Sequence, residues 1–219
     1  MMLSSALQQE IEAFAHHLRE EHSLFSKARD GQLSAQAITR YLNNVLYLIQ
    51  HTPVHLKLAS QAAQNEGNAG LASYFEEKFR EEQGHDEWAR SDIRTLDERR
   101  SVAAVDDVSD HIRGLTGYLR RVIGKNPTAY VAYILLAEYL MVLLGEEWIS
   151  SLEQGCDIPR DALSVVGNHV ALDRVHATRG FEEVDGFLQA DGELSCLRDT
   201  LRRSMTYMEE FFSEVAEAA

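Results

Sequence analysis

Three residues in the last quarter of the chain, His169, Asp173 and His176, have the types and the spacing of a metal-binding stripe. On an α-helix each residue advances by about 100°, so offsets of four and then three keep these side chains within roughly 40° of one another. A buried helical face at this spacing is normally apolar. Two imidazoles and a carboxylate on one face therefore need partners. A metal ion is one such partner, and hydrogen bonds or an ion pair with Arg174 or Arg179 are the other interpretation.

Two further segments place acidic or imidazole groups where an apolar face is expected. Glu82 and His85 lie three residues apart in FREEQGHDEWARSDI, an arrangement found in carboxylate-bridged dimetal bundles, with Glu81 as the alternative to Glu82. Glu138 interrupts AYILLAEYLMVLLG, where a charge is costly unless it is paired or coordinated. The three segments supply three carboxylates and three histidines, about what two metal ions require. This mixture favours iron or manganese over structural zinc.

The elements that position these residues are expected to be helices. Apolar residues recur every three or four positions, and alternating strand patterns are absent. The predicted helices cover 5–29, 34–51, 53–65, 68–99, 108–123, 127–154, 159–188 and 193–217. Turns are expected at DGQLS, with Ser34 as a helix cap, and at GKNPT, and 102–110 is the best candidate linker. The sequence thus predicts an all-α bundle of about seven to eight helices in one domain, 1–219.

Composition narrows the possible partners and the compartment. The chain has 219 residues, 45% apolar and 26% charged, with a formal charge of −14. This balance argues against a nucleic-acid partner, which needs clustered cations. Two cysteines form no disulfide framework, and the start of the sequence has no signal-peptide pattern. The apolar run 130–145 is too short for a typical membrane span and contains Glu138. We therefore expect a cytoplasmic protein that does not enter a membrane.

Four segments of the sequence, three of which contain the candidate metal ligands, resemble the haem-oxygenase-like di-iron oxidase and oxygenase family. They are YLNNVLYLIQHTPVHLKLA, EEQGHDEWARSDIRTL, LLAEYLMVLLG and HVALDRVH, and the resemblance extends over most of the chain. The family shares its fold with TenA-type thiaminases and pyrroloquinoline quinone synthase. The resemblance therefore implies a haem-oxygenase-like helical fold. It also implies an iron centre that activates dioxygen for oxidative cleavage, decarboxylation or N-oxygenation.

Residue by residue, the resemblance implies a ligand set made of Glu82, His85, Glu138, His169, Asp173 and His176. In some relatives an acid lies seven residues before the histidine of the second ligand helix, and this chain has Lys78 there. The acidic ligand of that segment is therefore open between Glu82, Glu81, Glu77 and Glu21.

The same resemblance implies the cofactor and the partners. Two iron ions per chain are expected, with manganese as an alternative, together with dioxygen, a small organic substrate and an unidentified electron donor. Tyr47, Trp88 and Tyr139 are the aromatic residues that could line a substrate pocket, unless they belong to the core. One apolar face of the final helix, through Met205 and Phe212, is the surface on which a homodimer would form.

Three other functions remain open on this sequence. A TenA-like thiaminase or hydrolase needs an activated thiol, but neither Cys156 nor Cys196 lies beside an obvious base. A haem oxygenase would use His17 or His22 as its iron ligand, which leaves the internal carboxylates unexplained. A non-catalytic helical interaction protein would simply satisfy its polar core with hydrogen bonds.

Overall fold

The structure is a computed structural model that describes residues 3–100, 108–187 and 191–218. Within these ranges all the regular structure is helical, as the sequence predicts. In chain order the elements are α1 (Leu3–Glu20), α2 (Ser23–Arg29), α3 (Ala35–Asn65), α4 (Ala69–Glu81), α5 (Asp86–Arg100), α6 (Asp110–Ile123), η1 (Pro127–Tyr130), α7 (Val131–Gly155), η2 (Arg160–Ala162), α8 (Ser164–Phe187) and α9 (Asp191–Glu217).

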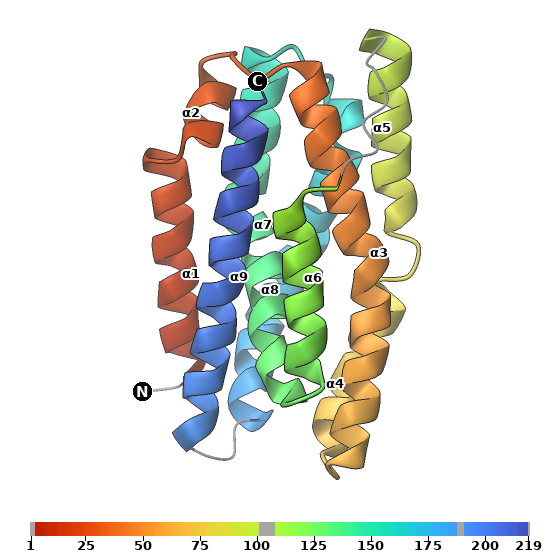
Figure 1. Cartoon of the computed structure of the whole chain (residues 1–219), viewed down its shortest axis with the longest axis vertical. Helices are drawn as coiled ribbons and strands as arrows, with labels where there is room; N and C mark the ends of the chain where they lie inside the picture. The colour runs from red at the N-terminus through yellow and green to blue at the C-terminus, as the bar shows by residue number, and fades with distance from the viewer. Residues whose placement is uncertain (1–2, 101–107, 188–190, 219) are drawn as a thin grey trace.

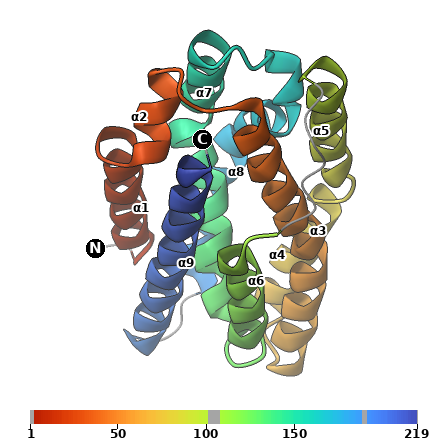
Figure 2. The same ribbon diagram turned by 45° about the horizontal axis from the view of Figure 1, so that its top comes forward.

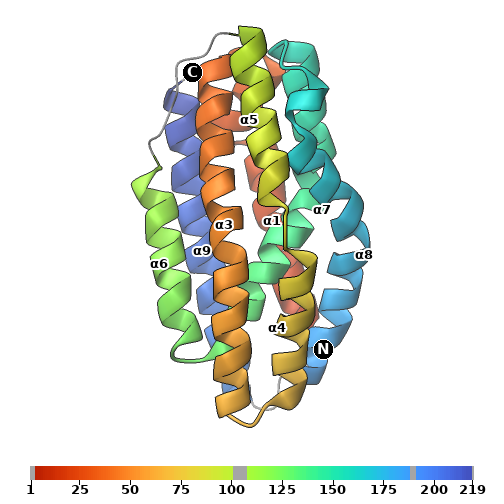
Figure 3. The same ribbon diagram turned by 90° about the vertical axis from the view of Figure 1, so that its right-hand side faces the viewer.

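The longer helices run close to the long axis of an elongated bundle (Figure 1). Helix α9 lies between α1 and α6, and α7 lies behind it (Figures 1 and 2). Helices α4 and α5 follow one another along the side of α3, joined by a short turn (Figure 3). Helix α8 packs along α7 and also contacts α5 (Figure 3). This arrangement brings the turn between α4 and α5 next to α7 and α8.

Helix α7 is the central core helix. By length and composition alone, Pro127–Gly155 could cross a membrane, because its most apolar 18-residue window has a mean hydropathy of 1.7. The helix is longer than the apolar run 130–145 on which the expectation of a short segment was based. Its apolar character continues past residue 145 through Trp148 and Leu152. However, 72% of its most apolar window is buried against the rest of the chain. Such burial is typical of the core helix of a bundle.

Several predicted helix boundaries differ from the structure. The segment 5–29 is divided because His22 caps α2, its side chain accepting a hydrogen bond from the Leu24 backbone N–H at 3.1 Å. Conversely, Pro53 lies inside α3 instead of starting a new helix. Proline costs a helix one backbone hydrogen bond. Burial of Ile49 and Leu56 on either side holds α3 continuous despite that cost.

The break between α4 and α5 matters most for function. The sequence predicts one helix over 68–99, but α4 ends at Glu81 and α5 begins at Asp86. Gly84 in this turn has a φ of 87°, a backbone conformation that residues with a side chain rarely adopt. Glu82 and His85 therefore do not share a helical face, as their spacing suggested. They lie in the turn itself.

The predicted caps and the terminal helix can also be compared with the structure. Ser34 caps α3, its hydroxyl oxygen accepting from the Ala37 N–H at 3.1 Å. Residues 102–107, most of the candidate linker 102–110, lie outside the described residues. Met205 and Phe212 of α9 are buried within the chain's own bundle, so this face is already covered. A homodimer stays a prediction, without support from that face.

Candidate metal centre

The side chains that the sequence singled out as ligands come together in two groups of three. The first group is Glu82, His85 and His169, and the second group is Glu138, Asp173 and His176. Within each group, one potential ligand atom per residue lies within 4.8 Å of the others. The groups are adjacent because Asp173 follows His169 by one turn of α8. The tertiary fold thus assembles the six residues from the α4–α5 turn, α7 and α8.

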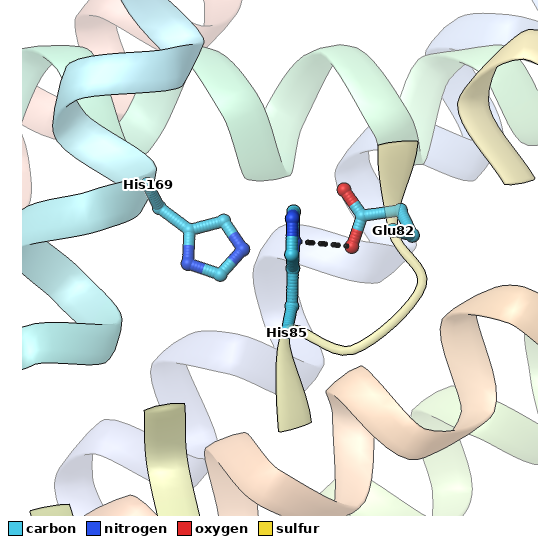
Figure 4. A group of neighbouring side chains, drawn as sticks. All are labelled: Glu82, His85 and His169. Carbon is cyan, nitrogen blue, oxygen red and sulfur yellow. Dashed lines mark ion pairs between the residues drawn. The ribbon is translucent and has the colours of Figure 1, made fainter. Parts of the chain in front are cut away.

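The first group brings together side chains from the α4–α5 turn and from α8 (Figure 4). Glu82 Oε2 lies 3.4 Å from His85 Nδ1, and the rings of His85 and His169 meet edge to face with centroids 5.1 Å apart. His169 Nδ1 donates to the Val165 carbonyl oxygen at 2.7 Å, which leaves Nε2 as the nitrogen with a free lone pair. Trp88 stacks on the His85 ring, with centroids 4.2 Å apart, and also meets the His169 ring edge to face at 5.6 Å.

Helix α8 is held in register by Asp92, a residue that the sequence pattern did not single out. Asp92, on α5, is fully buried and accepts hydrogen bonds from Ser164 Oγ at 2.5 Å and the Val165 N–H at 2.7 Å. A carboxylate at a helix start satisfies free N–H groups and complements the helix dipole. The only signal in the sequence was that Asp92 shares the buried face of Ala89 and Leu96. Asp92 thereby fixes the helix that carries half of the candidate ligands.

The second group contains a cation of the chain itself. Lys78, in the last turn of α4, places Nζ 2.8 Å from Glu138 Oε1 and 3.1 Å from Glu81 Oε2. His176 lies 3.7 Å from Asp173 and 3.8 Å from Glu81. Lys78, Glu138 and Asp173 are only 7%, 8% and 4% exposed, so water screens these charges poorly. Glu81 thus pairs with Lys78, and Glu82 is the acid that joins the first group.

Burial dominates the protonation of the second group. It raises the pKa of Asp173 to about 8, assisted by the charges of Glu138 and Glu82. It also raises the pKa of Glu138 to about 7, although Lys78 acts in the opposite direction. Burial lowers the pKa of His176, and Lys78 lowers it further. In the metal-free chain at neutral pH, Asp173 therefore mostly keeps its proton and His176 is neutral.

The first group has a different balance. Burial alone would raise the pKa of Glu82, but the close contact with His85 and the charge of His169 bring it below its usual value. Burial lowers the pKa of His169. Glu82 is therefore an anion beside a neutral His169 imidazole, the protonation state in which both residues bind metals. Lys78, although buried, has a raised pKa because Glu138 and Glu81 surround its ammonium group.

These donors fit a divalent metal of intermediate hardness. Imidazole nitrogens and carboxylate oxygens suit iron, manganese and related ions. His85 Nδ1 and Glu138 Oε2 are also buried without a hydrogen bond. Buried polar atoms normally have a partner, and a bound metal ion would provide one in each ligand group.

A cavity of about 150 Å³ adjoins both groups. Its wall is largely apolar, and it includes Tyr41, Ile49, Tyr133, Met208 and Phe211. Glu82, Glu138, His169 and Asp173 also line it, so the polar residues meet the apolar space directly. An organic molecule in this cavity would lie next to the candidate ligands.

The three aromatic residues expected to line a substrate pocket are not part of this wall. Trp88 packs on His85, and Tyr47 packs on His51 with ring centroids 4.1 Å apart. The Tyr139 hydroxyl donates to Glu12 at 2.7 Å. Tyr139 follows Glu138 by one residue, and the 100° step turns it away from the cavity. The aromatic residues of the cavity wall are Tyr41, Tyr130, Tyr133, Phe211 and Phe212.

The residues behind the alternative functions have other roles. The Cys156 thiol donates to the Ala28 carbonyl oxygen at 3.5 Å, and burial raises its pKa, which disfavours the reactive thiolate. His22 Nε2 is 3.0 Å from the Ser213 hydroxyl, and His17 pairs with Glu209 at 2.8 Å. Each histidine thus has a structural partner, and neither adjoins the cavity. These contacts favour neither an activated thiol nor a haem ligand.

Neither a protein-family model nor a curated protein sequence matches the chain. Several solved structures are similar in fold. A domain of unknown function with a haem-oxygenase-like fold from Shewanella denitrificans has a TM-score of 0.84 at 16% identity, covering 98% of this chain and 92% of its own.

Two further structures extend the comparison. A CADD-like protein of unknown function from Nostoc punctiforme has a TM-score of 0.71 at 17% identity, covering 100% of this chain and 99% of its own. A TenA homolog from Pseudomonas syringae pv. tomato has a TM-score of 0.69 at 16% identity, covering 98% and 93%. At these identities the likeness concerns the fold. The chain has the haem-oxygenase-like fold, as its sequence segments indicated.

Proposed function

We propose that this protein is a non-haem iron oxidase or oxygenase that uses dioxygen to oxidise a small, largely apolar organic molecule. The observation that carries the proposal is the meeting of two carboxylate–histidine groups with an apolar cavity. Perturbed carboxylates and neutral histidines beside a cavity are typical of a functional site. A purely structural core has no need for six such residues around one space.

In this proposal, some residues would bind the metal and others would hold those ligands in position. Glu82, His85 and His169 would hold iron, and the second group would provide further ligands or charge. Bound iron would supply Lewis acidity and redox capacity, and manganese is the alternative ion for the same donors. Asp92 sets the position of α8, and Trp88 restrains His85. Such neighbours orient the ligands and tune their affinity.

The cavity would select and shield the substrate. Its apolar wall favours an alkyl or aromatic group and disfavours water, which strengthens electrostatic interactions at the polar edge. No cluster of cations lines it to hold a phosphate, because Lys78 is its only described lysine or arginine and is already paired. An external electron donor and a cytoplasmic location belong to the same proposal. The donor is included because dioxygen accepts more electrons than one simple substrate oxidation releases.

Metal binding and dioxygen consumption test this proposal. Metal-free protein is loaded anaerobically with ferrous iron, passed through a desalting column and assayed by elemental analysis, and oxygen uptake then follows on exposure to air. We expect retained iron in the native chain, loss of iron in His169→Ala, and native behaviour in the control His111→Ala, whose imidazole pairs with Glu210 on the surface. A native chain that retains neither iron nor manganese, or an unchanged His169→Ala, would refute the proposal.

A further inference from the structure

Lys78 occupies a place in the second group that is suited to a cation. The last turn of α4 carries its side chain toward α7, where Nζ contacts Glu138 Oε1 at 2.8 Å. Glu81, three residues further along, contributes Oε2 at 3.1 Å. Lys78 and Glu82 are four residues apart, so α4 directs a cation and a metal-binding anion toward neighbouring groups. The ammonium group is therefore built into the centre by the same helix end that delivers Glu82.

The carboxylates of the second group already have the positive charge that their burial requires. Removing one partner of a buried ion pair leaves an uncompensated charge, so Lys78 and Glu138 depend on each other. A divalent ion bound to Glu138 and Asp173 would lie close to the ammonium group. Two cations at such short range repel strongly where little water screens them. The buried positions of Lys78 and Glu138 meet this condition.

Within the part of the chain that the structure describes, no lysine or arginine pairs with the first group. His85 Nδ1 has no hydrogen bond and lies 3.4 Å from Glu82, and His169 is oriented by its bond to Val165. These three residues are thus poised for an ion that the chain does not supply. The difference between the groups is one of charge, because each offers carboxylate and imidazole donors in a similarly small space.

We propose that Lys78 takes one of the two cation positions of the centre, so that the native chain holds one divalent metal, at Glu82, His85 and His169. This inference rests on the proposed metal binding and changes its stoichiometry. The ammonium group balances Glu138 and Glu81 in place of a second ion. Lys78 is in this sense a positioning residue, because it acts through the carboxylates that it holds.

Metal stoichiometry tests the inference without any assay of activity. Native protein and Lys78→Met are loaded with excess Mn²⁺, desalted and compared by elemental analysis and electron paramagnetic resonance. The native chain should retain one ion with the spectrum of isolated Mn²⁺, and Lys78→Met should retain two ions with the spectrum of a coupled pair. Lys125→Met, which removes an exposed lysine, should behave as the native chain.

The outcomes separate this inference from the proposed function. Two ions in the native chain, or one in a folded Lys78→Met variant, would overturn the inference and leave metal binding intact. If neither the native chain nor Lys78→Met retained an ion, both the inference and the proposed metal binding would be overturned.

A second pair of variants keeps the test decisive if Lys78→Met does not fold. In the native background, His85→Gln should abolish Mn²⁺ retention, because it removes a ligand of the first group. His176→Gln should retain the single ion, because its group is balanced by Lys78. Equal partial losses in both variants, or retention only in His85→Gln, would contradict the assignment.

Discussion

The two groups of potential ligands use the same kinds of donor, but the first has one carboxylate and two imidazoles, whereas the second has two carboxylates and one imidazole. Their surroundings also differ. The first is formed at a turn, around Glu82 and His85, and no lysine or arginine among the described residues pairs with it. The second lies between helices, and Lys78 pairs with its Glu138. A count of histidines and carboxylates therefore does not give the number of metal ions. The charges that the fold places beside each group decide how much positive charge remains to be supplied.

The strongest way to test this difference is to remove charges from metal-free protein. Lys78→Met leaves the carboxylates of Glu138 and Glu81 without their cation, and should lower the free energy of unfolding by about 3 kcal/mol. Glu82→Gln removes an acid that contacts no ammonium group, and should cost at most about 1 kcal/mol. Urea unfolding at pH 8 in the presence of a chelator measures both values. Equal costs would mean that the two groups do not differ in internal charge balance.

His55, a buried histidine outside both ligand groups, provides a reference for the pH dependence of the free energy of unfolding. Burial lowers the pKa of His55 to about 4, with further contributions from the charges of His51 and Arg120. Because the unfolded chain binds this proton near pH 6.5, neutral His55 contributes its full stability above that pH. The contribution is lost as the pH falls from 6.5 to 4, by about 3 kcal/mol.

The His55→Gln variant isolates this contribution. Its free energy of unfolding, measured by urea titration between pH 7 and pH 4, should fall less steeply than that of the native chain. The difference should be the same with and without Mn²⁺ at pH 6 and above, since His55 belongs to neither ligand group. A His55→Gln profile parallel to the native one would show that His55 titrates normally in the folded protein.

The smallest expected effects are those of substituting Trp88 and Tyr139, two aromatic residues to which the sequence analysis gave the same expected role. Trp88 stacks on His85, so Trp88→Leu should weaken Mn²⁺ binding to the first group by about tenfold, as loss of a ligand's support does. Tyr139→Phe removes a hydrogen bond to Glu12 near the surface, and should cost about 1 kcal/mol or less without changing metal affinity. Calorimetric titration and urea unfolding measure these changes. Equal metal affinities in the two variants would remove Trp88 from the support of the centre.

The sequence by itself determined the helical character of the described chain and the six residues that come together. Periodicity at three and four residues is a local property, so it predicted helices and the caps that start them, as at Ser34. Polar residues on apolar faces also stand out locally, which is why Glu138 and Asp173 could be recognised. The haem-oxygenase-like fold was likewise indicated by short segments of sequence.

Only the tertiary structure decided how these residues are distributed. The break at Gly84 moved Glu82 and His85 from one helical face into a turn, and the packing of α4 along α3 brought Lys78 within 2.8 Å of Glu138 on α7. The cavity wall and the role of Asp92 also depend on helices far apart in the sequence. Local patterns specify which side chains share a face. Burial, pairing and protonation depend on which faces meet, and this is a property of the folded bundle.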